Sequence, residues 1–420
     1  MSQFPGRSSF QCSPVFPEAK YFVSKDHCQS EFSSSIRPIL TVEPDSLVHV
    51  ETNDCFHGKV QPNNNDITVN GVSAFDWLSA IPLKDRNPVT GPIFIQGAEK
   101  GDVLAVTLVD IRPQGVGVAC CGSDSGQLCH WMRQYKRENK DPCTTDADAS
   151  VAAIRFFDLT EETTCQEVGN GRDTTRIMVT MRETYHTDGV ANNNGNKNDE
   201  SVKRIGPIAF PASPMLGVIG VAPAEEEDDS IGTMPAGKHG GNLDNRANGI
   251  GSTIYLPVNH AGALLSIGDM HASQGDGEIS GTGVEIGGHV LLTCHAWKRN
   301  ELYPNKSKDN GNSLSIPLQL EYPVTETATH WITYGVVIEN IPQTTQIACQ
   351  EAAKILMGQW GFSLEEAFIF LSVQGDLGLC QACHPDTGTQ IAKMSVPKLK
   401  SVCPRPFRAV WEKIPMEMLT

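Results

Sequence analysis

The sequence predicts a mainly β fold, a β-sandwich or barrel-like scaffold with a C-terminal pair of helices, and an α+β class overall. Its 420 residues include 38 glycines and 26 prolines, which favour turns and short strands over long helices. The apolar segments are short and bounded by Gly, Pro or Asn, as strands are. Apolar residues recur at helical spacing only late in the chain.

The expected strands can be placed in chain order. Residues 47–51 (LVHVE) alternate between apolar and polar, as a half-buried strand does. The turn-forming residues 87–92 precede two strands around a tight turn, at 93–97 and 101–110. After Pro214 the strands return, at 217–221, 253–258, 263–267 and 290–294.

Two helices are expected next to each other near the C-terminus. In the first, the residues on one face are Ile347, Ala348, Ala352, Ile355 and Leu356. The second begins with a capping box, in which Ser363 and Glu366 satisfy free N–H groups of the first turn, before an apolar run at 367–371. We expect the two helices to form a hairpin packed on the sheet.

The chain is long enough for two domains. We expect an irregular N-terminal arm (1–40), an N-terminal β domain (41–210), a β-rich catalytic domain with the helical hairpin (211–390) and a C-terminal tail (391–420). Within the first domain, residues from about 113 to 203 read as a solvent-exposed insertion of loops, because its end, at 187–196, is too polar to fold alone.

Charge and composition narrow the classes of partner. A formal charge of −16 and a pI near 5.2 argue against nucleic acid and against an anionic membrane surface. The chain has no run of about 18 apolar residues that would span a membrane, and its first ten residues lack a signal peptide's apolar stretch. The expected location is cytoplasmic. The 13 cysteines show no repeated spacing and do not indicate a disulfide framework.

The densest group of reactive side chains lies in residues 268–278. Asp269, His271, Asp276 and Glu278 follow the apolar strand at 263–267, and the glycines between them allow tight turns that bring these side chains together. Carboxylates with an imidazole suit a divalent ion, with zinc first and manganese or calcium as alternatives. Upstream, Asp54 is a further candidate ligand. The structural alternative is a Gly/Asp-rich turn whose carboxylates cap nearby N–H groups.

A second polar loop, residues 238–245, is long enough to reach the same cleft. There Asn242, or backbone N–H groups of the loop, would steady a carbonyl oxygen. Glu285 follows the acidic segment, but a glutamate in such a position is usually a solvated one.

Six strings carry a family resemblance, in order along the chain: NPVTGP (87–92) with GAEKGD (97–102), GVAP (220–223), GGNLD (240–244), GDMH (268–271), QGDGE (274–278) and GT (281–282). With them the chain resembles the acetamidase/formamidase family. The resemblance covers about 45–112 and 204–390 and leaves out 113–203, the first 40 residues and the tail.

This resemblance implies a mainly β fold with a helical pair, a homo-oligomer, and hydrolysis of a short amide to carboxylate and ammonia. It places the metal ligands at Asp54, Asp269, His271 and Glu278. From the chemistry of these segments, the catalytic residues we expect are Glu278, Asn242 and Asp276. The residues expected to contact substrate are Gly241, Asn242, Asp244 and Gln274.

In the mechanism we expect, the metal lowers the pKa of a coordinated water and orients it toward the amide carbon. Glu278 is the general base and then the acid for the leaving amine, unless it is itself a ligand. Asn242 or loop N–H groups hold the oxyanion.

Three alternatives remain open. Cys55, beside Asp54 and near His57, is a minor candidate for a nucleophile. A non-catalytic β-scaffold binding module would use the acidic loop to hold a structural cation. A hydrolase of larger or N-formylated amides would differ in its pocket volume.

Overall fold

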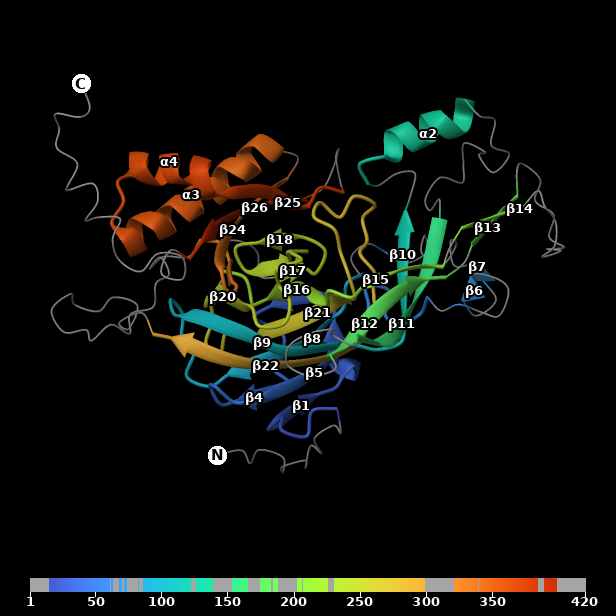
Figure 1. Cartoon of the computed structure of the whole chain (residues 1–420). Helices are drawn as coiled ribbons and strands as arrows, with labels where there is room; N and C mark the ends of the chain where they lie inside the picture. Colours follow the sequence, from blue (N-terminus) through green and yellow to red (C-terminus); the bar gives the residue numbers. More distant parts are fainter. Residues whose placement is uncertain are drawn as a thin grey trace, which may run out of the picture.

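Two large sheets build the molecule in the computed structural model (Figure 1). It describes residues 15–60, 62, 68–69, 72–73, 82, 86–121, 126–138, 153–164, 174–182, 184–187, 202–205, 207–225, 230–298, 321–338, 340–383 and 389–398. The mainly β fold with a late helical pair is confirmed.

The larger sheet has nine strands, ordered β1 (Tyr21–Val23), β5 (Val48–Thr52), β22 (Gly288–Trp297), β9 (Val103–Pro113), β20 (Thr253–Pro257), β23 (Val324–Glu326), β24 (His330–Ile338), β26 (Thr389–Pro397) and β25 (Asp376–Gln381). The second has seven, ordered β18 (Ala236–Gly237), β19 (Gly240–Asn242), β16 (Met215–Gly220), β21 (Leu265–His271), β8 (Val89–Ile95) and β2 (Cys28–Gln29), with β4 (Leu40–Val42) also on β8.

The two sheets share one hydrophobic core, which makes them a sandwich. Val50 and Leu108 of the nine-stranded sheet pack in one cluster with Ile93, Ile219 and Ile267 of the seven-stranded sheet. All residues of β16 and β21 are buried, so these strands lie in the interior. A polar side chain on either strand is therefore surrounded by protein.

The helices α3 (Ile341–Trp360) and α4 (Leu364–Gln374) cover the end of the nine-stranded sheet that holds β24 and β26 (Figure 1). Ala348 and Leu356 of α3 share a core cluster with Trp331 of β24. The capping box of α4 is present, because Ser363 accepts from the Glu366 N–H and Glu366 accepts from the Ser363 N–H. The expected hairpin on the sheet is confirmed.

Several expectations about the rest of the chain were wrong. Within 113–203, expected to be loops, the structure has β10 (Val116–Cys121), α2 (Cys129–Glu138), β11 (Ala153–Thr164), β12 (Thr174–Met181) and β13 (Thr184–Thr187). Of these, β10, β11 and β12 form a four-stranded sheet with β15 (Ile208–Pro211), and β13 pairs with β14 (Val202–Ile205). Both faces of this sheet hold buried apolar residues, with Val118 and Phe156 in one cluster and Phe157 and Val179 in the main core.

The two ends of the chain also hold more structure than expected. Residues 1–40, expected to be irregular, contain η1 (Lys25–His27), β1, β2 and β3 (Glu31–Ser33), the last paired with β17 (Ser230–Gly232). Residues 391–397, expected in the tail, belong to β26. A further hairpin joins β6 (Thr68–Val69) to β7 (Val72–Ser73). The two strands expected around the turn at 97–101 lie in different sheets, as β8 and β9.

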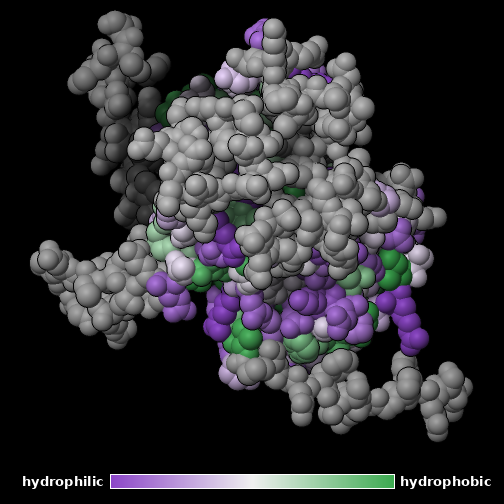
Figure 2. All heavy atoms as spheres, turned by 90° about the vertical axis from the view of Figure 1, so that its right-hand side faces the viewer, coloured by the Kyte–Doolittle hydropathy of each residue, from purple (hydrophilic) through white to green (hydrophobic). Residues whose placement is uncertain are grey.

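The helices, the surface and the cysteines bear on the expectations about membranes, partners and disulfides. None of the helices in the described ranges is long and apolar enough to cross a membrane. On the face shown in Figure 2, the hydrophobic patches among the coloured residues are small and lie between hydrophilic ones. The nine cysteines in the described part of the chain are free thiols.

Candidate metal and catalytic centre

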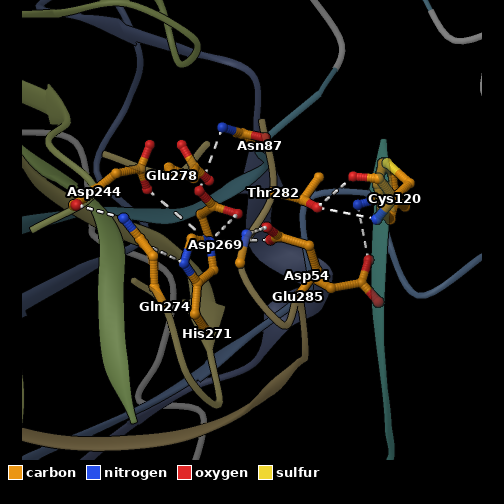
Figure 3. A network of polar contacts seen from close by, with 12 residues as sticks. Asp54, Asn87, Cys120, Asp244, Asp269, His271, Gln274, Glu278, Thr282 and Glu285 are labelled. Carbon is orange, nitrogen blue, oxygen red and sulfur yellow. Dashed lines mark hydrogen bonds and ion pairs between the residues drawn. The ribbon is translucent and has the colours of Figure 1, made fainter. Parts of the chain in front are cut away.

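Asp269 and His271 project from the buried strand β21 toward a group of carboxylates (Figure 3). The sequence placed both in a turn after a strand ending at residue 267, but the strand continues to His271. Because they are two residues apart on one strand, they are expected on the same face. The strand thereby supplies a rigid base for the site.

The His271 ring is the centre of the group. Its Nε2 lies 3.0 Å from Glu285 Oε2, 3.5 Å from Asp269 Oδ1 and 4.0 Å from Asp244 Oδ1. In addition, Asp244, His271 and Glu278 offer ligand atoms that all lie within 4.8 Å of one another. All five side chains are at most 6% exposed.

Hydrogen bonds assign the tautomer of His271. Gln274 Nε2 donates to the Asp244 carbonyl oxygen at 2.7 Å, so Gln274 Oε1 is left to accept from His271 Nδ1, also at 2.7 Å. With the proton on Nδ1, the lone pair of Nε2 faces the carboxylates. A histidine whose other nitrogen is held in this way is typical of a metal ligand.

The atoms at the centre lack hydrogen-bond partners among the described residues. They are His271 Nε2, Asp244 Oδ1, Asp269 Oδ1 and Glu285 Oε2. Although Nε2 and Glu285 Oε2 are only 3.0 Å apart, their alignment does not make a hydrogen bond. Buried polar atoms without partners are costly, and bound cations are partners that these atoms could share. The residues therefore fit a divalent metal ion.

The second oxygen of each carboxylate is held by the protein. Asp269 Oδ2 accepts from Asn87 Nδ2 at 3.3 Å, and Asp244 Oδ2 accepts from Gln381 Nε2 at 2.8 Å. Glu285 Oε1 accepts from the Gly283 N–H at 2.8 Å. Such contacts orient ligands and are the usual outer shell of a metal site.

The backbone at three of these acids is strained. Asp244, Asp269 and Glu278 have φ angles of 42°, 52° and 43°, in the left-handed region that L-residues rarely adopt. Each such residue costs on the order of 1–3 kcal/mol, and strain of this kind clusters at functional sites.

Burial and mutual repulsion disturb the ionisation of the group. Burial, with the charges of neighbouring carboxylates, raises the pKa values of Asp244, Glu278 and Glu285 above the ordinary carboxyl range. Burial by itself lowers the pKa of His271, but the carboxylates of Glu285 and Asp269 raise it well above its usual value. The cluster therefore favours a bound proton or a bound cation.

Asp54, an expected ligand, lies near this group, but its carboxylate accepts hydrogen bonds from the backbone of its own loop. It is buried, and its Oδ1 accepts from the N–H groups of Phe56 and Gly58, both at 2.8 Å. It belongs to neither set of converging ligand atoms found among the described residues. Asp54 shapes the loop that follows β5.

Asp276 does not turn toward Asp269 and His271 as the sequence suggested. Its carboxylate is 42% exposed and forms an ion pair with Lys393. It lines a pocket of about 330 Å³ with Gly277, Ile279, Leu379 and Ala382, among others. Gly277 and Ile279 are the chain neighbours of Glu278, whose own side chain does not line the pocket.

The loop expected to contact substrate is buried beside the site. Gly241 and Asn242 lie in β19, next to β16, and Asn242 Oδ1 has no partner among the described residues. Gly241 has a φ of 88° and lies so close to Pro235 that a Cβ would be 2.5 Å from its carbonyl oxygen. Asp244, expected to contact substrate, is instead a member of the ligand cluster.

The sequence missed three contributors. Glu285 was set aside as a solvated residue, yet it is 2% exposed and 3.0 Å from His271. Asn87 and Gln381 orient carboxylates from distant parts of the chain. A glycine is needed at residue 283, two residues before Glu285, because a Cβ there would lie 2.6 Å from His271 Nδ1. This glycine is a sequence signal that the chain near Glu285 packs closely against His271.

Cys55 is close to the cluster but is a poor nucleophile as it stands. Burial, with the nearby carboxylates of Glu285 and Asp269, raises the pKa of the Cys55 thiol well above its ordinary value. Without a cation the thiol stays protonated, which argues against cysteine catalysis.

A β-sandwich with a buried cluster of carboxylates around one histidine has the side chains of a hydrolytic active site, in a set that can hold a divalent ion. A family model described as the Acetamidase/Formamidase family matches residues 18–377. The chain belongs to this family. The match also spans residues 113–203, which the sequence resemblance left out.

Individual relatives carry the names of the same family. The chain is 28% identical to an acetamidase of Mycolicibacterium smegmatis over 79% of its own length and 81% of the relative's. It is 27% identical to a formamidase of Methylophilus methylotrophus over 60% of each chain. Among solved structures, an acetamidase from Bacillus halodurans superimposes with a TM-score of 0.63 at 25% identity, covering 91% of this chain and 98% of the other.

Proposed function

We propose that this chain hydrolyses short aliphatic amides, formamide or acetamide, to carboxylate and ammonia. The observation that carries the proposal is the buried set of four partnerless ligand atoms around His271, in a member of the acetamidase/formamidase family. The names of the relatives supply the substrate class.

Asp244, His271 and Glu278 would hold the metal ion, with Asp269 and Glu285 beside them. Zinc is the first choice for this mixture of imidazole and carboxylate donors, and manganese and calcium are the alternatives. When bound, such an ion polarises an amide carbonyl and lowers the pKa of water.

The protein's own groups do the remaining work. Gln274 keeps the Nδ1 proton of His271 in place, so that Nε2 always faces the cluster. If Glu278 does not itself bind the ion, its carboxylate would take the proton of the attacking water and pass it to the leaving amine. Asn242 would donate its amide N–H to the carbonyl oxygen.

The pocket wall combines the half-exposed carboxylate of Asp276 with apolar side chains, which suit an aliphatic acyl group. The apolar side chains are those of Ile279, Ile341, Leu379 and Ala382. A volume of about 330 Å³ exceeds what formamide needs, so amides with longer acyl chains are the second candidate substrates.

The test is ammonia release from formamide, acetamide, propionamide and butyramide by the purified chain, with an N-formylated amine as a further substrate. We expect turnover of the short amides, with a preference set by the apolar pocket wall. A protein that binds metal but releases no ammonia from any of them would be a binding module, and the proposal would be wrong.

The expected homo-oligomer has a candidate contact surface on α4. Leu364, Phe368, Ile369 and Val373 are between 59% and 71% exposed. Apolar side chains gathered in this way are typical of protein interfaces. We propose that a second copy of the chain covers this face. The cytoplasmic location remains a prediction.

We expect the wild-type chain to elute as a dimer or larger, and Phe368→Glu to reduce the mass measured by light scattering. A charge at the centre of the contact would have to be buried without a partner. Ile208→Glu is the control, since Ile208 is 48% exposed on β15, away from α4. A monomeric wild type, or a variant of unchanged mass, would refute this interface.

A further inference from the structure

A second set of ligand atoms adjoins the first. Cys55 Sγ and one carboxylate oxygen each of Asp269 and Glu285 lie within 4.8 Å of one another, and all three residues are buried. His271 Nε2, which belongs to the first set, is 3.5 Å from Asp269 and 3.0 Å from Glu285. We propose that the chain binds a second divalent cation through Cys55, Asp269 and Glu285, next to the ion of the first set.

The carboxylates of Asp269 and Glu285 are held in orientations that suit metal ligands. Each has one oxygen fixed by a protein donor, Asn87 Nδ2 for Asp269 and the Gly283 N–H for Glu285. The other oxygens, Asp269 Oδ1 and Glu285 Oε2, are buried without a hydrogen-bond partner among the described residues. Both are nine-tenths buried or more, at 2% exposure. A cation is the partner that such oxygens lack.

The thiol is held in place by its loop. Asp54 Oδ1 accepts the N–H groups of Phe56 and Gly58, which closes the chain tightly around Cys55. The carbonyl oxygen of Cys55 accepts from the Asn87 N–H at 3.2 Å. Since the Asn87 side chain also holds Asp269, one residue ties the thiol to its carboxylate neighbour. This gives Asp54 a positioning role in place of the ligand role expected for it.

Charge balance supports two cations. When ionised, the buried carboxylates of Asp244, Asp269, Glu278 and Glu285 carry four negative charges. Within the described ranges, His271 is the only basic side chain in ion-pair distance of Asp244, Asp269 and Glu285. One divalent ion offsets two of these four charges and two ions offset all four, which leaves only the charge of the ionised Cys55 thiolate. Uncompensated buried charge is strongly destabilising.

The second position has its own metal preference. A thiolate is a soft ligand that selects zinc or cobalt over calcium or magnesium. On binding, the S–H bond of Cys55 breaks, its proton passes to solvent, and the sulfur lone pair forms the bond to the cation. The inference shares the cluster of the proposed function, but it does not depend on the substrate being an amide.

Cobalt(II) titration of the metal-free protein tests the inference. We expect two equivalents per chain and a near-ultraviolet thiolate-to-cobalt absorption. Cys55→Ser should bind one equivalent and lose this absorption. Glu285→Gln should also bind one equivalent while keeping the bond from Gly283, and its circular dichroism shows whether it is folded.

Two other thiols are the controls. Cys383 Sγ is 3.9 Å from Glu278 Oε2, and Cys120 is hydrogen-bonded through its backbone to Thr282 near Glu285. Cys383→Ser and Cys120→Ser should keep both equivalents and the absorption. If the wild type binds one equivalent without the absorption, or if the absorption survives Cys55→Ser, the inference is wrong. Amide turnover by a protein that binds one ion would support the proposed function and refute the second site. Two bound ions without amide turnover would support the second site and refute the proposed function.

Discussion

Replacing Glu278 with glutamine is expected to lower kcat/KM for the best short amide by roughly 100- to 10,000-fold, the usual contribution of a general acid–base group. Glutamine has nearly the same shape but cannot take a proton from water. Its amide would still lie beside Gln381 and Cys383, so the local packing is largely kept. Steady-state ammonia release measures the loss.

Metal content separates the two roles open to Glu278. If it is the base, the variant keeps its metal and loses turnover; if it is a ligand, the metal content falls as well. Glu351→Gln is the matched control, because Glu351 is also a buried glutamate, 5% exposed, but lies in α3 paired with Lys354. A Glu278→Gln enzyme with wild-type kcat/KM would exclude both roles.

Gly217→Ala is the second large effect we expect. The register of β16 and β21 sets Gly217 opposite Asp269, and a Cβ at residue 217 would lie 2.5 Å from Asp244 Oδ1 and 2.7 Å from Asp269 Oδ2. One methyl group would push apart two buried carboxylates of the cluster. We expect metal affinity to fall by about 10- to 100-fold, as when outer-shell contacts of a metal site are lost, with a parallel loss of turnover.

Gly275→Ala is the control for this substitution. Gly275 lies in the acidic segment itself, but a Cβ there would meet no atom within 4 Å. We expect its metal affinity and turnover to match the wild type. Equal metal affinity in Gly217→Ala and the wild type would mean that the two carboxylates do not bind the ion together.

The sequence predicted the fold class because local patterns carry it. The alternation at residues 47–51 became β5, and the capping box at Ser363 began α4. The strands within 113–203 were missed because their apolar residues are buried only by distant partners, as Phe156 and Val118 show in one cluster with Cys55 and Phe56. Polar residues such as Arg155 and Asp158 interrupt the apolar ones in β11, so no regular alternation marks the strand.

Only those residues of the site that lie close together in the sequence could be predicted to meet. Asp269, His271 and Glu278 are close in the sequence, so their convergence could be read from a short segment. Glu285 and Asp244 join them through β pairing and through a positive φ at Asp244, and no pattern in one sequence announces either. The misplacement of Asp54 and Asp276 has the same origin, because both carry the right chemistry but face other partners.

We propose that the cluster around His271 binds a metal ion that amide hydrolysis requires. The most direct measurement is ammonia release by one preparation before chelation, after removal of the metal, and during titration with zinc, manganese or calcium. We predict that turnover disappears with the metal and returns in proportion to the ion bound. Full turnover by protein shown by elemental analysis to be metal-free would mean that amide hydrolysis does not require an ion at this cluster.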